Sequence, residues 1–184
     1  MKDVFIKYKS VILFIVIFFG SYFLLSVLYN FYLKASADSA YYPDFFTELV
    51  AKQSAAVLEA FGYKTQLQDY TVGEGKLLTI DPGFSVNVVE GCNAISVIIL
   101  FFSFVISFAQ GFKKTFLFLL AGTVLIYIVN VLRIALLTVA LHKYPEHNHT
   151  LHGVVFPALI YGMVLVLWIA WIRSIKSDKS DKDS

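Results

Sequence analysis

Charged residues are scarce in this chain: Asp, Glu, Lys and Arg make up 15% of its 184 residues, whereas hydrophobic residues make up 58%. One small soluble core cannot bury that much apolar surface, so the composition excludes an ordinary soluble domain and favours a protein of the lipid bilayer. The formal net charge is only +2, and the lysines are scattered, which argues against nucleic acid as a partner.

Cysteine is nearly absent, because Cys92 is the only one in the chain. A single cysteine excludes an internal disulfide, and it excludes CxxC redox motifs and zinc ribbons. Any chemistry at Cys92 is therefore that of a lone thiol, and no cofactor is expected.

Long apolar runs dominate what is present, and four of them approach the roughly 20 residues that a spanning helix needs. They are Val11–Leu33, Ala94–Ala109 with its flanks, Thr115–Leu141 and Val154–Trp171. Three short flanks of these runs carry basic residues: Lys2, Lys7 and Lys9 before the first run, Lys113 and Lys114 between the second and third, and Arg173 and Lys176 after the fourth. The positive-inside rule makes these flanks cytoplasmic. The sequence thus predicts an all-α polytopic membrane protein with about four transmembrane helices and a small extracytoplasmic α+β cap.

Four regions follow from this pattern. Residues 1–33 form an N-terminal tail and the first span, residues 34–91 an extracytoplasmic segment, residues 92–173 a bundle of three helices, and residues 174–184 a disordered cytoplasmic tail. Within the outer segment we expect an amphipathic helix from Asp44 to about Phe61, then short strands at Tyr70–Val72, Leu77–Ile80 and Val86–Val89. Ala35-Ser36-Ala37 resembles a signal-peptidase site, but the preceding apolar run is longer than a signal sequence, so we expect an uncleaved anchor.

Cys92 lies where the outer segment becomes the second apolar run, in Glu90-Gly91-Cys92-Asn93-Ala94. A thiol at a helix N-terminus meets the positive end of the helix dipole, which favours the nucleophilic thiolate. Glu90 and Asn93 are candidate supporting residues. The alternative is that Cys92 is simply a small buried apolar residue.

Arg133 lies inside the third apolar run, roughly 27 Å along a helix that begins at Thr115, so we expect it near the outer boundary of the hydrocarbon. A guanidinium in an apolar span marks a functional site or a specific partner by default. Asn130, one turn earlier, is placed to orient it. The alternative is an arginine that snorkels toward the outer headgroups.

All four histidines lie between His142 and His152, in what the sequence predicts to be an outer loop. His152 immediately precedes the last span and is the candidate acid and base for Cys92, with His149 as a supporting residue. The others are expected to be solvated. A zinc site of His147, His149 and His152 is the rival interpretation, although the spacing lacks the helical H-E-x-x-H pattern.

These three blocks, Glu90–Ala94, Asn130–Arg133 and the segment from His152 into the last span, resemble the signature blocks of the exosortase/archaeosortase family. The stretch His149–Gly162 resembles the exosortase F type. The resemblance implies a cysteine transpeptidase or protease of the bacterial inner membrane, with Cys92 as nucleophile and Arg133 and His152 completing a site that faces the periplasm. It also implies substrates that are exported proteins with a C-terminal hydrophobic sorting signal.

Two alternatives from other classes remain at this point. One is a non-enzymatic membrane assembly factor in which Arg133 pairs with an acidic residue of a partner helix. The other is a zinc-dependent membrane hydrolase that uses the His142–His152 segment.

Overall fold

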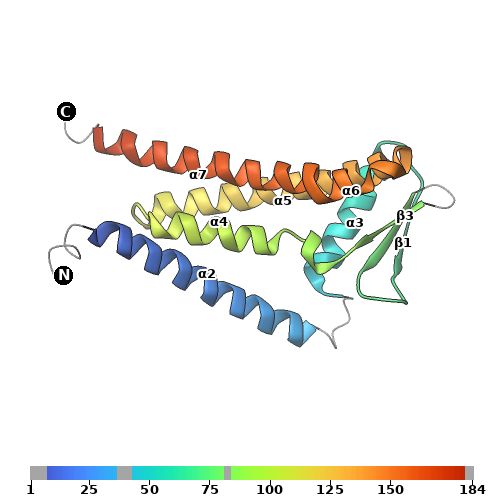
Figure 1. Cartoon of the computed structure of the whole chain (residues 1–184), viewed down its shortest axis with the longest axis horizontal. Coiled ribbons are helices and arrows are strands. Elements are labelled where there is room, and N and C mark those ends of the chain that lie inside the picture. Colours follow the sequence, from blue (N-terminus) through green and yellow to red (C-terminus); the bar gives the residue numbers. More distant parts are fainter. Residues whose placement is uncertain (1–7, 37–42, 81–83, 181–184) are drawn as a thin grey trace.

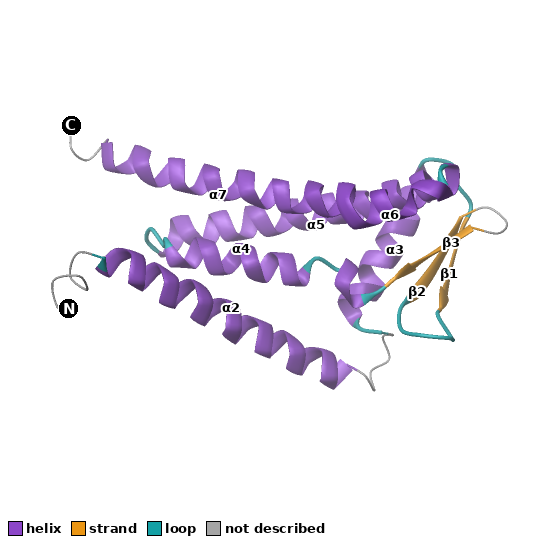
Figure 2. Ribbon diagram, viewed as in Figure 1, coloured by secondary structure: helices purple, strands orange, loops and turns teal. Residues whose placement is uncertain are grey.

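The computed structural model describes residues 8–36, 43–80 and 84–180, and side chains up to residue 176. Lys2, Lys7 and Ala37, used above for topology and for the possible cleavage site, lie outside these ranges. The described chain is mostly helical with one small sheet (Figure 2). The start of α2 (Lys9–Ser36), the end of α7 (Phe156–Ser180) and the turn between α4 (Ile95–Ser107) and α5 (Phe112–Lys143) lie at one end of a helical bundle (Figure 1). The helix α3 (Phe45–Ala60) and the sheet lie at the other end.

Three helical stretches are long and apolar enough to cross a membrane. They are α2 (Lys9–Ser36), α5 (Phe112–Lys143) and Pro145–Lys176, which contains most of α7 (Phe156–Ser180). The predicted second span corresponds to α4 (Ile95–Ser107), which is apolar but has only 13 residues. At 1.5 Å per residue α4 is about 20 Å long, shorter than a hydrocarbon core of about 30 Å.

The bundle core is built from aromatic and aliphatic side chains of α4, α5 and α7. Phe104 stacks on Trp168 at 4.4 Å between ring centroids, and Phe118 packs on Trp171 at 4.7 Å. We call this half the basic end, because α2 begins there with Lys9, the first turn of α5 there holds Lys113 and Lys114, and the last turns of α7 there hold Arg173 and Lys176. Lys114 Nζ donates to the Ser174 carbonyl at 3.1 Å, which joins the start of α5 to the end of α7.

The outer segment forms a cap of α3 (Phe45–Ala60) and an antiparallel sheet of order β1-β2-β3. The strands are β1 (Thr65–Asp69), β2 (Lys76–Ile80) and β3 (Phe84–Val88). Leu78 and Ile80 of β2 and Val88 of β3 share a core with Val50 of α3 and Ile134 of α5. We call this half of the molecule the cap end. Because α5 is 32 residues, or about 48 Å, long, its last third lies among the cap elements.

The first predicted strand, Tyr70–Val72, is wrong, because those residues belong to the turn that follows β1. Tyr70 N donates to the Gly75 carbonyl at 3.1 Å and closes that turn. Gly75 has a φ of +125°, a conformation that glycine adopts readily. The pairing of β1 with β2 therefore decides where the strand lies, despite the β propensity of Tyr70 and Val72, and Leu67 lies opposite Leu78.

The predicted outer loop His142–His152 is also wrong, because this stretch is almost wholly helical. His142 ends α5, His147 lies in η2 (Pro145–His147), His149 in α6 (Asn148–Thr150), and His152 in η3 (Leu151–Val155), a π-helical turn that continues into α7. Pro145 starts a helical turn, where proline is tolerated, rather than breaking one. Pro157 lacks an N–H and crowds the carbonyl four residues earlier, which explains why the helix widens just before it.

Residues 174–184 were expected to form a disordered tail, but α7 continues through Ser180. Ile175 is buried and belongs to the bundle core, so the helix is extended by packing that the polar composition of the tail did not reveal. Residues 181–184 lie outside the described part of the chain.

Candidate active site

Cys92 lies in a short connection between the cap and the bundle. It ends the 3-10 turn η1 (Glu90–Cys92), which follows β3 and stands just ahead of α4. Its N–H donates to the Val89 carbonyl at 2.8 Å. The side chain is half-buried against the core of the cap end, and the thiol is free. Glu90, two residues earlier, is exposed.

Asn93 fixes this connection to three other elements. It is 1% exposed, and its Oδ1 accepts from Ile95 N at 3.0 Å at the start of α4. Its Nδ2 donates to Tyr29 Oη of α2 at 2.7 Å and to Thr47 Oγ1 of α3 at 3.2 Å. A buried amide whose hydrogen bonds are satisfied in this way defines one geometry. The backbone that follows Cys92 is therefore held by α2, α3 and α4 together.

Ala94, between Asn93 and α4, has a φ of +65°, which is unfavourable for a residue with a Cβ. Such a conformation costs about 1–3 kcal/mol and persists only where the surroundings enforce it. Here the bonds of Asn93 and the burial of Ala94, which is 5% exposed, provide that enforcement. Backbone strain is thus stored two residues after Cys92.

Asn130 of α5 connects Cys92 to Arg133. Asn130 is fully buried, and its Nδ2 donates to the Cys92 carbonyl at 2.6 Å. Its Oδ1 accepts from Arg133 Nη1 at 3.2 Å. The Asn130 amide therefore forms hydrogen bonds with both Cys92 and Arg133, and it links the arginine of the third apolar run to the connection that holds the cysteine.

Arg133 retains donor capacity in this position. The residue is half-buried, and its Nε is buried without a hydrogen-bond partner among the described residues. A buried unpaired donor on a cation is costly, since it loses water without a replacement. Arg133 therefore keeps one N–H without a hydrogen bond, next to the connection that Asn130 makes to Cys92.

The polar network extends beyond the residues that the sequence singled out. Thr47 Oγ1 donates to Asp44 Oδ2 at 2.5 Å, and Asp44 caps α3 by accepting from Phe46 N and Thr47 N. Tyr29, Asp44 and Thr47 escaped sequence reasoning as site residues. Asp44 ahead of a helix was a visible signal for a helix start, but nothing in the sequence connects it to Cys92.

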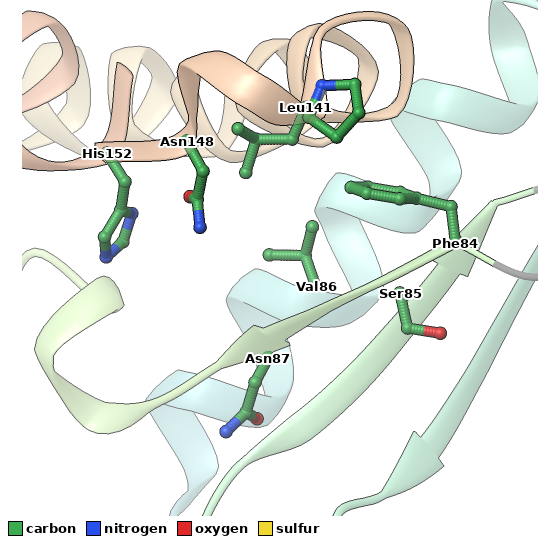
Figure 3. A pocket seen from close by; sticks show the side chains of 8 residues that line it. Phe84, Ser85, Val86, Asn87, Leu141, Asn148 and His152 are labelled. Carbon is green, nitrogen blue, oxygen red and sulfur yellow. The ribbon is translucent and has the colours of Figure 1, made fainter. Parts of the chain in front are cut away.

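The histidines lie apart from this network. His152 is exposed and lines a cleft of about 340 Å³ together with Asn148, Pro145, Leu141 and the β3 residues Phe84, Ser85, Val86 and Asn87. Cys92 does not line this cleft. In Figure 3, His152 and Asn148 point from their helix toward β3. His149 is exposed, and His147 Nδ1 lies 3.1 Å from Glu146 Oε1. The structure thus brings Cys92, Asn130, Arg133 and Asn93 together, and it leaves His152 in a neighbouring cleft.

The zinc alternative gains no support from the histidines. Within residues 8–36, 43–80 and 84–180, no group of three or more His, Cys, Asp or Glu side chains is arranged as a metal site would require. His147, His149 and His152 lie on successive 3-10, α-helical and π-helical turns, and so they do not form the loop that the zinc alternative assumes.

Comparison with known proteins supplies the family. No curated protein and no solved structure matches the chain. A family model described as transmembrane exosortase matches residues 10–172, a range that includes Cys92, Asn130, Arg133 and His152. Because this match covers most of the chain, and three of its helical stretches can span a membrane, the protein is an integral membrane protein that belongs to the transmembrane exosortase family.

Proposed function

We propose that the chain is an exosortase of the F type, acting as a membrane cysteine transpeptidase or protease on exported proteins with a C-terminal hydrophobic sorting signal. The observation that carries the proposal is the bond pair on Asn130, which holds the Cys92 carbonyl and the Arg133 guanidinium at once. The family match supports the class of protein. The residue roles rest on this local arrangement and on the chemistry of a lone thiol.

The proposed reaction is acyl transfer through a thioester. The Cys92 thiolate attacks a substrate peptide carbonyl, so that a C–S bond forms and the carbonyl electrons move onto oxygen. The tetrahedral intermediate collapses, the C–N bond breaks, and the leaving amine takes a proton from an acid. Water or an amine then attacks the thioester and releases the thiolate. Water as acceptor makes the enzyme a protease, and an amine makes it a transpeptidase.

Arg133 and His152 have separate roles in this scheme. Arg133 stabilises negative charge, either on the thiolate or on the oxyanion, with the positive charge of a guanidinium that Asn130 holds in place. His152 is the acid and base. Its cleft is bounded by β3, and β3 runs into the η1 turn that carries Cys92. The supporting roles of Asn93 and Asn130 are to hold the Cys92 backbone, and Glu90 and His149 remain secondary candidates.

The proposed topology keeps four spans, with α4 reaching across the membrane together with its flanking turns. Both termini are cytoplasmic, and the cap of residues 34–91 lies in the periplasm against the catalytic bundle of residues 92–173. The cluster of basic residues at one end of the bundle supports this orientation. In Cys92→Ala, which has no cysteine, a thiol introduced as Gln66→Cys should react with an impermeant maleimide added outside intact cells. A thiol introduced as Lys176→Cys should not, and its labelling from outside would overturn the topology.

The function is tested by mass spectrometry of the C-termini of membrane and surface proteins. Cells with the wild-type chain should show new C-termini just ahead of hydrophobic tails, and cells with Cys92→Ala should lose them. Ser107→Ala, at the opposite end of α4, is the matched control, since it also removes one polarisable atom from a small, half-buried side chain. Unchanged C-termini in Cys92→Ala at equal expression would reject the cysteine mechanism, and a non-enzymatic assembly factor would then be the better account.

A further inference from the structure

The cleft beside His152 runs along the free edge of the sheet. Within the described part of the chain β3 pairs with β2 on one side only, so its other edge is unpaired. Four consecutive β3 residues, from Phe84 to Asn87, line the cleft. Neighbouring side chains of a strand point to opposite faces of the sheet. A cavity that touches all four must therefore run along the strand edge, where backbone N–H and C=O groups face it.

The opposite wall combines polar and apolar groups. Asn148 and His152 project toward β3 from the helical segment (Figure 3), while Leu141 and Pro145 provide apolar contacts. Phe84 and Val86 pack on the small core of Leu137, Leu141 and Phe156, which fixes the edge strand against the bundle. The cleft is thus a slot with a hydrogen-bonding strand edge on one side and two polar side chains on the other.

We propose that an extended peptide segment of the exported substrate binds in this slot as a fourth strand beside β3. This inference rests on the proposed function and adds how the substrate is recognised. Strand addition supplies main-chain hydrogen bonds that do not depend on sequence, and the flanking side chains select among peptides. Four strand residues span about 13 Å, which matches about four residues of extended peptide.

The position of the slot suits delivery to Cys92. β3 ends at Val88, and Cys92 follows four residues later in the η1 turn. A peptide aligned with β3 is therefore directed toward the cysteine connection, and it passes the His152 side chain on the way. This arrangement gives a reason for the separation of His152 from Cys92, because the substrate backbone occupies the space between the two walls.

The test is photo-cross-linking in the Cys92→Ala protein, where bound substrate is not turned over. Benzoylphenylalanine is placed at Ser85 on β3 or at Asn148 on the opposite wall. The control position is Gln66 on β1. Gln66 pairs opposite Thr79, and Thr79 pairs opposite Ser85. Gln66 and Ser85 are therefore exposed residues in one row of the same sheet, at its two edges. The adducts are identified by mass spectrometry.

Ser85 and Asn148 should both give adducts with peptides that directly precede a C-terminal hydrophobic segment, and Gln66 should give none above background. Equal yields at Gln66 and Ser85, or no adduct at either cleft position in protein present at the wild-type membrane level, would overturn the inference. If Cys92→Ala abolishes processing but neither Ser85 nor Asn148 gives cross-links to substrate, the proposed function stands and strand addition fails. If the cleft cross-links while Cys92→Ala still processes substrate, peptide binding stands and the cysteine mechanism fails.

Discussion

The basic end and the cap end of the bundle are held together by different forces. At the basic end, Phe104 stacks on Trp168 and Phe118 packs on Trp171, and both indole N–H groups are buried without partners among the described residues. Ring packing therefore outweighs hydrogen bonding there. At the cap end, the buried side chains of Asn93 and Asn130 each make hydrogen bonds to more than one element or residue.

Because of this difference, the two ends should respond differently to substitution. Packing at the basic end makes stability depend on volume, because close-packed interiors tolerate little added or removed bulk. The polar connections at the cap end are directional, and each one bears on the backbone around Cys92. Substitutions at the basic end should thus change how much protein folds, whereas substitutions at the cap end should change what the folded protein does.

The largest expected effect concerns His152, which lies at the cap end outside the polar network. His152→Ala should reduce substrate cleavage by about 10²–10⁴-fold, the contribution of a positioned acid and base. His142→Ala and His147→Ala should retain most activity. The activity of His149→Ala should lie between that of these two variants and that of His152→Ala. Cleavage of a tail-bearing substrate at matched expression is the measurement. Full activity of His152→Ala would move the base to another residue, with His149 the next candidate.

The next effect concerns the pair Asn130 and Arg133. Asn130→Ala leaves the Cys92 carbonyl without its donor and releases Arg133, and a buried group left unpaired in this way costs about 1–3 kcal/mol. Arg133→Ala removes the charge, and Arg133→Lys keeps the charge but loses the planar donor fork. All three should slow cleavage and slow alkylation of the only thiol in the chain. Alkylation at the wild-type rate in all three would show that Arg133 does not influence the Cys92 thiol, which would contradict the role given to the polar connections of the cap end.

The smallest effect on processing is expected at the basic end. A Cβ at Gly122 of α5 would overlap the Phe101 ring of α4, whereas a Cβ at Gly20 of α2 meets nothing within 4 Å. Gly122→Ala should lower stability by about 1–3 kcal/mol through overpacking, and Gly20→Ala should not lower it. Thermal unfolding in detergent measures both. Processing per folded molecule should be unchanged, and a specific loss of processing in Gly122→Ala would contradict the division between the two ends.

The sequence predicted the features that depend on local pattern. Three of the four predicted spans form helices long enough to cross a membrane, and Asp44 marked the start of α3, where it caps the helix. Asn130 and Arg133 share a helix face because they are three residues apart, so their hydrogen bond could be anticipated. In each case the interacting residues lie within a single helix or next to its first turn.

The connection around Cys92 escaped prediction because it depends on partners far apart in the chain. The bond between Asn93 and Tyr29 joins residues 64 positions apart, and no spacing rule anticipates it. Residues His142–His152 were predicted to form a loop, yet Pro145 begins a helical stretch there. Tyr70–Val72 has strand propensity, but the turn closed by Gly75 moved β1 to Thr65–Asp69. The pairing of β1 with β2 thus decided where the first strand lies, against the local preference of Tyr70–Val72.

The central claim is that Cys92 forms a covalent thioester with its substrate, and the most direct measurement is mass spectrometry of the Cys92 peptide from membranes in the presence of substrate. The account predicts an acyl adduct on Cys92 that hydroxylamine removes as a hydroxamate, and this adduct should form much more slowly in Arg133→Ala and in His152→Ala. Substrate cleavage that proceeds at the wild-type rate in Cys92→Ala, with no adduct on this peptide in the wild-type protein, would contradict it.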